Sequence, residues 1–210
     1  MKRHERAALF LERLGVRYPH PATHLNAQSA WELLVATVLA AQCTDKRVNM
    51  VTPALFARWP GPAELAEAPI EELEACIRST GFYHNKAKNL IAAARRVTDV
   101  YGGEVPRTMD DLITLGGVAR KTANVVLWGA FGINEGLAVD THVGRIALRM
   151  GFTRFKDPVR AEKDLMALFP REEWGNVNHR MVWFGRDVCD ARKPACPVCE
   201  MCDICPSSTL

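Results

Sequence analysis

The sequence predicts an all-α protein, and two observations support this fold class. Several segments carry apolar residues at helical spacing, and residues typical of helix caps stand at their ends. No alternating apolar and polar run is long enough for a strand, and no Asn-Gly or Asp-Gly pair joins two such runs. With 210 residues, of which 48% are hydrophobic, the chain can bury a core as one large domain or two small ones.

The first helical segments lie near the N-terminus. Residues 1–15, MKRHERAALFLERLG, indicate an amphipathic helix whose charges interrupt the apolar run that a secretory signal needs. Ser29 and Glu32 have the spacing of a capping box, in which each side chain satisfies a free amide of the first turn. The run at 31–42, WELLVATVLAAQ, is apolar on almost every side, so we expect a buried central helix there.

The remaining helices are predicted from caps and periodicity. Pro69 stands where a first-turn proline opens a helix, and Gly81 stands where a C-terminal cap would end it. Asp157 and Pro158 form an N-cap followed by a proline at the first helical position. Further helices are predicted at 86–100, 108–114, 121–131, 142–150, 158–169 and 176–188.

Charge and hydropathy narrow the class of protein. A formal net charge of +3 permits a polyanionic partner without requiring one. No stretch approaches the roughly 20 apolar residues of a membrane span, so we expect no membrane partner and a reducing, cytoplasmic location. In that compartment the seven cysteines need a reason other than disulfide bonds.

A glycine pair, Gly116-Gly117, joins two helical patterns in the segment LGGVARKTA at 115–123. Glycine allows a tight turn with positive φ or a close approach of the backbone to a ligand. The following helix begins near Arg120, and the free amides of its first turn could bind a phosphate. An ordinary connector between two helices explains the same residues equally well.

Lys121 lies in the first turn of that helix, close to the positive end of the helix dipole. A cation is unfavourable there, so the neutral amine, the form that can attack a carbon and form a Schiff base, is favoured. The alternative is a solvated lysine that lies beside a phosphate.

Asp140 ends a short apolar stretch at 136–140, directly before a helical pattern, and is well placed as an N-cap. The helix dipole favours its ionised form. A permanent anion paired with a neutral lysine can stabilise positive charge on a sugar while the lysine attacks it. Capping alone would also explain this aspartate, and both roles can hold together.

The C-terminal cysteines indicate a metal site. Cys189, Cys196, Cys199 and Cys205 are separated by short loops, with Cys202 between the last two. Four thiolates at such spacing suit a tetrahedral zinc ion or an iron–sulfur cluster, and the spacing leaves both metals and the choice of four cysteines open. Nearby prolines keep the stretch out of a helix.

Arg192 and Lys193 lie in the loop between the first two of these cysteines. If metal ligands fix that loop, the two side chains project from a rigid base, and we expect them to contact DNA phosphates. A solvated basic pair is the alternative.

The three elements in this order resemble the endonuclease III family of DNA glycosylases. The matching segments are LGGVARKTANVV, AVDTH and Cys-x6-Cys-x2-Cys-x5-Cys. PHPATHLNAQSAWELLVATVLAAQCTDKRVN and GFYHNKAKNL are similar to the family as well, so the resemblance covers nearly the whole chain.

The resemblance implies two helical domains with a DNA-binding cleft between them. A six-helix barrel at 23–134 would carry a helix-hairpin-helix at about 112–124, and residues 1–22 with 135–210 would hold a [4Fe-4S] cluster. It further implies a bifunctional glycosylase and AP lyase of base excision repair. Such an enzyme excises oxidised pyrimidines from double-stranded DNA through a lysine Schiff base and cuts 3′ to the abasic site by β-elimination. The damaged nucleotide would be flipped out of the stack. We expect a monomer associated with the nucleoid.

The resemblance also assigns site residues. Lys121 matches the nucleophile, Asp140 the catalytic aspartate, and Cys189, Cys196, Cys199 and Cys205 the cluster ligands, which leaves Cys202 as an extra cysteine. Gln42 and Phe82 match residues that enter the gap left by the flipped base, a task suited to an amide and an apolar wedge. The other expected DNA contacts are Lys86, Leu115, Gly116, Gly117, Val118, Ala119, Arg120, Thr122, His142, Arg192 and Lys193.

Three departures from the family pattern stand out. Gly116 and Ala119 replace a proline and a glycine of the usual hairpin, and Phe82 replaces a common leucine. We expect a looser turn and altered DNA binding.

The related adenine-mismatch glycosylase is the closest rival, but it carries a glutamate where this chain has Thr37 and lacks a lysine at position 121. A non-enzymatic DNA-binding protein with a structural zinc is the second rival.

Overall fold

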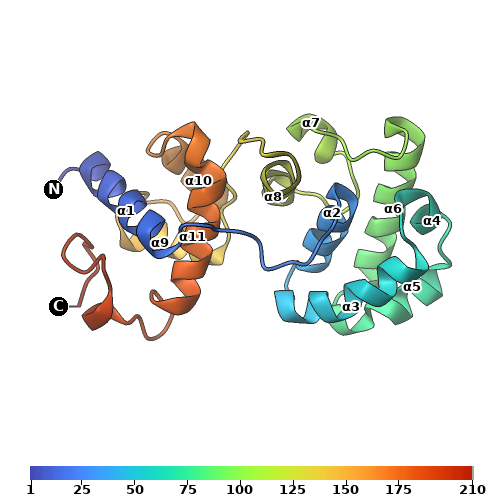
Figure 1. Ribbon diagram of the computed structural model, residues 1–210, viewed down its shortest axis with the longest axis horizontal. Coiled ribbons are helices and arrows are strands. Elements are labelled where there is room, and N and C mark those ends of the chain that lie inside the picture. The colour runs from blue at the N-terminus through green and yellow to red at the C-terminus, as the bar shows by residue number, and fades with distance from the viewer. Residues whose placement is uncertain (210) are drawn as a thin grey trace. The chain divides into compact units, whose positions relative to one another are not determined.

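The structure is a computed structural model that describes residues 1–209. The described residues form α-helices and short 3-10 helices without any strand, which confirms the predicted all-α class (Figure 1). The chain divides into two compact units. One comprises Thr23–Ile133, and the other combines Met1–Ala22 with Asn134–Leu210.

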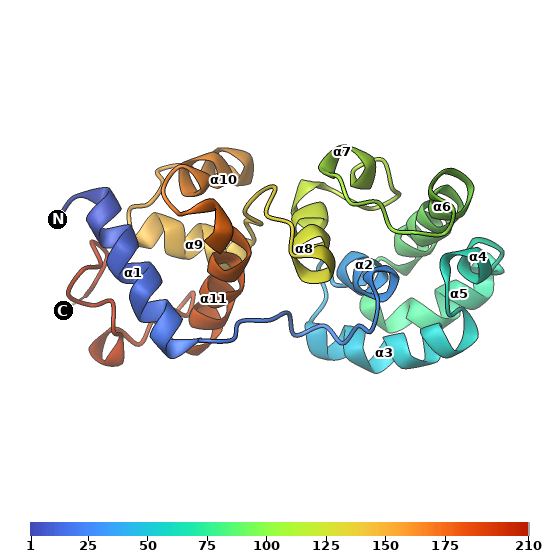
Figure 2. The same cartoon turned by 45° about the horizontal axis from the view of Figure 1, so that its top comes forward.

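The unit Thr23–Ile133 is built around one buried helix. This helix, α2 (Ala30–Leu39), packs against neighbours on several sides, as Figure 2 shows. Its neighbours and the other elements of the unit are α3 (Asp45–Arg58), α4 (Pro62–Ala66), α5 (Ile70–Ile77), η1 (Arg78–Thr80), α6 (Tyr83–Tyr101), α7 (Met109–Leu112) and α8 (Arg120–Phe131). The core of this unit therefore forms around the segment that the sequence predicts to be a central helix.

The start of α2 follows half of the predicted capping box. The Ser29 hydroxyl accepts a hydrogen bond from the Glu32 N–H at 3.1 Å. The Glu32 carboxylate accepts from the Gln28 N–H at 2.7 Å rather than from the amide of Ser29, so the reciprocal bond is shifted by one residue. Further along, the buried Thr37 hydroxyl donates to the Leu33 carbonyl at 2.7 Å and is satisfied inside its own helix.

Helices α3 and α4 are absent from the sequence prediction. α3 contains Pro53 in its interior, and an interior proline removes a backbone donor and usually ends a helix. The helix continues because Thr44 caps its start, accepting from the Arg47 N–H at 3.3 Å, and because Val48, Val51 and Leu55 are buried in the core. At α5 the predicted proline is the N-cap itself, since Pro69 precedes the first helical residue.

The second unit brings the two ends of the chain together. It contains α1 (Arg3–Arg17), α9 (Thr141–Arg149), α10 (Pro158–Met166), η2 (Arg171–Glu173), α11 (Trp174–Asp187) and η3 (Cys196–Val198). α1 packs against α11 in both ribbon views. Phe10 of α1 lies edge-on to Phe152 and Phe184, with ring centroids 5.1 and 6.1 Å apart. Aromatic packing therefore joins the N-terminal helix to a core formed by the last third of the sequence.

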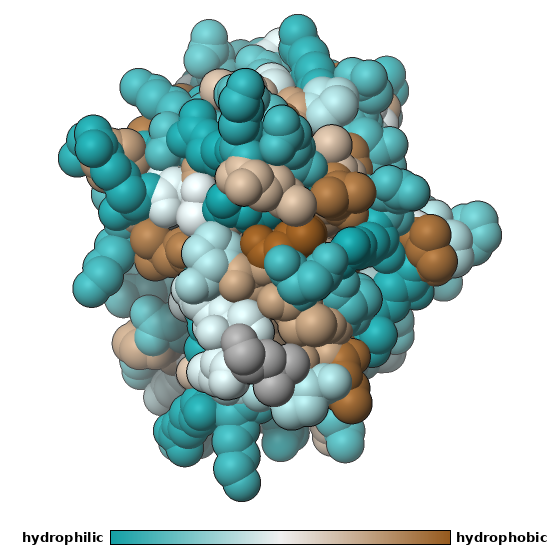
Figure 3. Space-filling model, turned by 90° about the vertical axis from the view of Figure 1, so that its left-hand side faces the viewer, coloured by the Kyte–Doolittle hydropathy of each residue, from teal (hydrophilic) through white to brown (hydrophobic). Residues whose placement is uncertain are grey.

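One face of this second unit is largely polar. Figure 3 looks at the side on which both termini lie and shows hydrophilic side chains over most of it, with smaller hydrophobic groups between them. Among residues 1–209, no helix combines the length and the apolar character needed to cross a membrane.

Candidate active site and cysteine centre

The glycine hairpin is a tight turn between α7 and α8. The Val118 N–H donates to the Leu115 carbonyl at 3.1 Å, and Gly117 has a φ of 76°, a conformation that glycine adopts without strain. Ala119 is the N-cap of α8, and its methyl side chain supplies no capping bond. The cap of α8 therefore supplies no side-chain acceptor to the backbone N–H groups of the first turn. A phosphate can bind to N–H groups of this kind.

Gly116 is packed against α6. A β-carbon at this position would lie 2.5 Å from the carbonyl oxygen of Asn89 and 3.2 Å from the Ala92 side chain. Any larger residue would force the two backbones apart. Gly116, which stands where the family pattern has a proline, therefore allows the hairpin to pack closely against α6. This packing is not apparent from the sequence.

Lys121 lies in the first turn of α8 with an exposed side chain, so its amine can reach a ligand from solvent. Lys121 therefore lies near the positive end of the helix dipole, as the sequence predicts. Its side chain is not buried. Arg120 beside it is exposed, and Thr122 is half-buried.

Asp140 is the N-cap of α9. Its Oδ1 accepts a hydrogen bond from the Val143 N–H at 2.8 Å, which leaves the second carboxylate oxygen without a capping role. His142, half-buried, lies in the first turn of the same helix, and its Nδ1 is 3.1 Å from the Arg145 guanidinium. Burial lowers the pKa of His142, and the carboxylate of Asp140 opposes this shift.

Asp140 also lines an open hollow of about 650 Å³ in the second unit. The other lining residues include Arg145, Arg149 and Lys156. The carboxylate therefore borders a basic depression that can accept an anionic ligand. Lys121 and Asp140 belong to different units of the chain.

Gln42 and Phe82 share an uncommon backbone conformation. Their φ angles are 53° and 49°, and no other non-glycine residue in the described chain has a positive φ. Both side chains are exposed, and Phe82 retains 62% of its accessible surface. The left-handed region costs a non-glycine residue roughly 1–2 kcal/mol, and such strain tends to occur at functional sites.

Three of the predicted DNA contacts have buried side chains. Lys86 is buried, with only 5% of its surface exposed, and its ammonium donates to two backbone carbonyls instead of reaching solvent. The side chains of Leu115 and Val118 lie in the core, and the Val118 N–H is already bonded inside the turn. Only backbone atoms of these two hairpin residues can approach a ligand.

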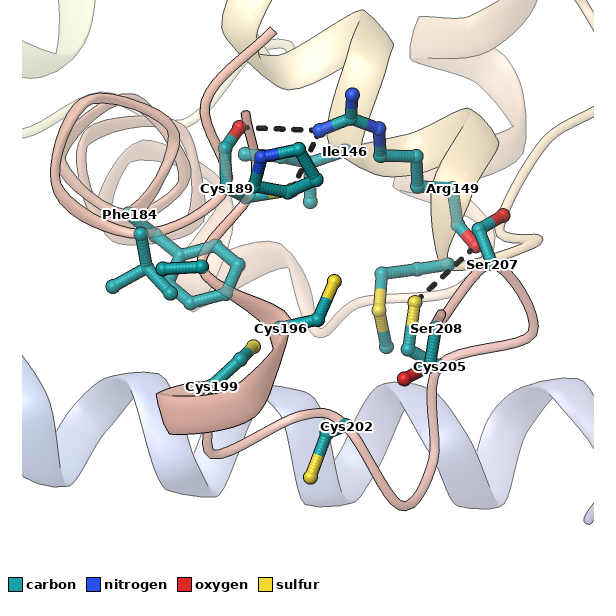
Figure 4. A pocket seen from close by; sticks show the side chains of 14 residues that line it. Ile146, Arg149, Phe184, Cys189, Cys196, Cys199, Cys202, Cys205, Ser207 and Ser208 are labelled. Atoms are coloured by element: carbon teal, nitrogen blue, oxygen red, sulfur yellow. Dashed lines mark hydrogen bonds between the residues drawn. The ribbon is translucent and has the colours of Figure 1, made fainter. Parts of the chain in front are cut away.

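The C-terminal cysteines surround a small cavity of about 40 Å³ in the second unit. Its walls are largely apolar and include Ile146, Met150 and Phe184. Figure 4 shows the sulfurs of Cys196, Cys199 and Cys205 facing this space, whereas the sulfur of Cys202, which also borders it, is turned away. Within residues 1–209, no three His, Cys, Asp or Glu side chains lie close enough to hold a single ion.

Hydrogen-bond donors surround the cysteine sulfurs. The Arg149 guanidinium donates to Cys189 Sγ at 3.2 Å, and the Met201 N–H donates to Cys199 Sγ at 3.4 Å. Hydrogen bonds from the Thr209 backbone and side chain lower the pKa of the Cys196 thiol, whereas burial raises the pKa of Cys199 to about 11. Thiolates of iron–sulfur clusters receive hydrogen bonds of this kind, so the donor set, the spacing and the apolar walls fit such a group.

The loop that follows Cys189 is fixed by hydrogen bonds. The Asp190 carboxylate accepts from the backbone N–H groups of Arg192 and Lys193 at 2.8 and 2.9 Å, which lowers the pKa of Asp190. Arg149 holds the same loop by donating to the carbonyls of Asp190 and Ala191 at 2.7 and 2.9 Å. The exposed side chains of Arg192 and Lys193 therefore extend from an ordered backbone.

Comparison with known proteins identifies the family. Residues 35–171 match the HhH-GPD superfamily of base excision DNA repair proteins. Endonuclease III of Synechocystis sp. is 50% identical over 204 residues, covering 97% of this chain and 93% of that protein. Endonuclease III of Bacillus subtilis is 46% identical, covering 89% of this chain and 85% of that protein. The chain belongs to the endonuclease III family.

Solved structures of endonuclease III agree with this membership. A non-covalent endonuclease III–DNA complex superposes with a TM-score of 0.94 at 44% identity, covering 99% of this chain and 97% of that one. A trapped endonuclease III–DNA covalent intermediate gives the same score and identity, covering 99% and 98%. A thermostable thymine-DNA glycosylase, 22% identical with a TM-score of 0.85, shares the fold.

Arg149 of this endonuclease III family member has a role that no sequence motif marks. Its guanidinium contacts a predicted cluster ligand and the basic loop, both about forty residues further along the chain. The spacing of Arg145 and Arg149, at i and i+4, places them on one face of the same helix and is the signal that the sequence offers. In the structure both donate to the Cys189 carbonyl, at 2.9 and 3.4 Å.

Proposed function

We propose that Lys121 and Asp140 carry the reaction of this chain, which is a bifunctional DNA glycosylase and AP lyase of base excision repair. The observation that supports Lys121 is its position: an exposed amine in the first turn of α8, immediately after the glycine hairpin. The similarity to a trapped covalent endonuclease III–DNA intermediate supports a mechanism with a covalent step.

In the proposed reaction, the neutral amine of Lys121 attacks C1′ of the damaged nucleotide, and the base leaves with the electrons of its glycosidic bond. The nitrogen then loses a proton and forms the C1′=N bond of a Schiff base, while the C1′–O4′ bond breaks and O4′ takes up a proton as the sugar ring opens. Loss of a proton from C2′ and departure of the 3′ phosphate complete β-elimination, which cuts the strand 3′ to the abasic site.

Asp140 is the proposed electrostatic partner. Its Oδ1 accepts a hydrogen bond from the Val143 N–H, and the N-terminus of α9 is a favourable place for a negative charge. A carboxylate stabilises the positive charge that develops on the sugar as the base leaves. The cap and the catalytic role are thus compatible in one side chain.

We propose oxidised pyrimidines in double-stranded DNA as the substrates. Gln42 and Phe82, both exposed and strained, are suited to fill the gap that a flipped nucleotide leaves. Backbone groups of the hairpin would bind phosphate on one unit. Arg192 and Lys193 would do so on the other.

We also propose that the unit Thr23–Ile133 is the helix-hairpin-helix domain and that the other unit holds a [4Fe-4S] cluster. Cys189, Cys196, Cys199 and Cys205 would be the ligands, with Cys202 outside the set because its sulfur is turned away. When bound, the cluster would supply covalent cross-links that hold residues 189–205 in place.

One chain carries both candidate catalytic residues, which supports action as a monomer, and the bacterial relatives support a place on nucleoid DNA.

Borohydride trapping tests the catalytic proposal. Duplex DNA with an abasic site or thymine glycol is incubated with the protein and borohydride, which reduces a Schiff base to a stable amine. We expect a covalent adduct that Lys121→Ala abolishes and that Lys88→Ala, at an exposed lysine of α6, retains. An undiminished adduct with Lys121→Ala would assign the nucleophile to another amine.

A further inference from the structure

Two strained loops of the first unit lie at the ends of helices. Gln42 follows the end of α2, and Phe82 follows the end of η1 and precedes α6. Each residue has a left-handed backbone, although glycine would adopt this conformation without a penalty. Surrounding contacts must therefore hold each loop in place.

Lys86 contacts the base of both loops. Its Nζ donates to the carbonyl of Leu39, the last residue of α2, at 2.8 Å. The same nitrogen donates to the carbonyl of Thr80, the last residue of η1, at 2.9 Å. The Lys86 backbone N–H also donates to the Phe82 carbonyl at 3.0 Å. A single residue thus connects the two helix ends from which Gln42 and Phe82 extend.

The chemistry of these contacts is specific. The carbonyls at a helix C-terminus have no partner within the helix and carry partial negative charge, so an ammonium is a favourable ligand for them. The burial of Lys86 is unfavourable in itself and lowers its pKa. An apolar side chain could fill the same core position without that cost, but it could not bind two carbonyl oxygens.

We propose that Lys86 is a positioning residue that fixes the loops of Gln42 and Phe82 relative to each other, so that both side chains enter one DNA gap together. The inference rests on the proposed function of these two residues as gap fillers. It gives Lys86, which the resemblance places among the DNA contacts, an indirect role in damage recognition.

Lys86→Met tests the proposal, because methionine keeps the length of the side chain and removes the donor. The measured quantity is the ratio of two affinities, for a duplex with a stable abasic analogue and for the same duplex undamaged. We expect this ratio to fall about 10- to 100-fold, a loss of the size that a misplacement of about 1 Å causes in reaction rates, with unchanged affinity for undamaged DNA. Lys88→Met, at an exposed lysine on the same helix, is the matched control and should keep the wild-type ratio.

Hydrogen exchange gives a readout that a general loss of stability would not reproduce. The N–H groups of Cys43 and Gly81 bond to the carbonyls of Ala40 and Arg78 within the two loops. In Lys86→Met these amides should exchange faster, while amides in the middle of α8 keep their protection. If the methionine variant does not fold, Lys86→Gln is measured instead, since its amide can donate to one of the two carbonyls. A wild-type ratio in a folded variant would overturn the proposal, whatever the exchange rates of these amides.

The gap-filling role itself is tested separately with Phe82→Ala. If this variant keeps the wild-type ratio, the proposed role of Phe82 fails, whatever Lys86 does. If Phe82→Ala lowers the ratio and Lys86→Met does not, only the positioning role fails. When both hold, adding Phe82→Ala to Lys86→Met should lower the ratio less than the product of the two single effects.

Discussion

Substitutions at Asp140 separate two roles that this side chain combines. As the N-cap of α9 it accepts a hydrogen bond from Val143 N–H at 2.8 Å, and as an anion it is the proposed stabiliser of the sugar cation. Asp140→Asn keeps an oxygen for the cap but removes the charge, whereas Asp140→Ala removes both. The pair of variants therefore assigns any defect to the cap or to the charge.

The expected magnitudes follow from the geometry. Loss of the charge at the helix N-terminus costs about 0.5 kcal/mol of unfolding free energy in either variant. Loss of the cap costs Asp140→Ala about 1 kcal/mol more. For a chain of this size that further loss lowers the melting temperature by about 2–4 °C. Base excision should fall roughly 100- to 1,000-fold in both variants, because both lack the anion.

Thermal unfolding and single-turnover excision of thymine glycol from a duplex measure the two effects independently. Affinity for the undamaged duplex should not fall in Asp140→Asn, which excludes a binding defect. Full excision by Asp140→Asn would refute the electrostatic role. Equal melting temperatures for the asparagine and alanine variants would refute the capping argument.

Three further predictions concern the hairpin, the cysteines and the basic loop. Gly116→Ala should lower the unfolding free energy by about 1–3 kcal/mol in denaturant titration, since the new methyl would crowd the α6 backbone; an unchanged midpoint would contradict the close approach. Cys202→Ser should retain wild-type iron content per chain while Cys199→Ser loses iron, and equal loss in both would argue against the proposed ligand set. The combined variant Arg192→Glu and Lys193→Glu should bind DNA more weakly and reduce the salt slope of log affinity by about 2, at roughly 0.9 per phosphate contact; an unchanged slope would reject the phosphate role.

The helices of the chain could be predicted where local signals are complete. Ser29 and Asp157 cap their helices as expected, at α2 and α10. The prediction failed at α3, where Pro53 argues locally against a helix and burial of Val48 and Leu55 in the unit's core outweighs it. Local propensity is decisive only where tertiary packing does not oppose it.

The sequence by itself determined the all-α class, the family and the candidate residues Lys121, Asp140 and the cysteines. These depend on residue type and short spacing, both of which are local properties. Only the tertiary structure decided where Lys86 lies, because burial depends on what packs around a residue, and Leu39 is 47 positions away. The same holds for the contact of Arg149 with Cys189, which exists only because the chain folds back to bring distant segments within hydrogen-bond distance.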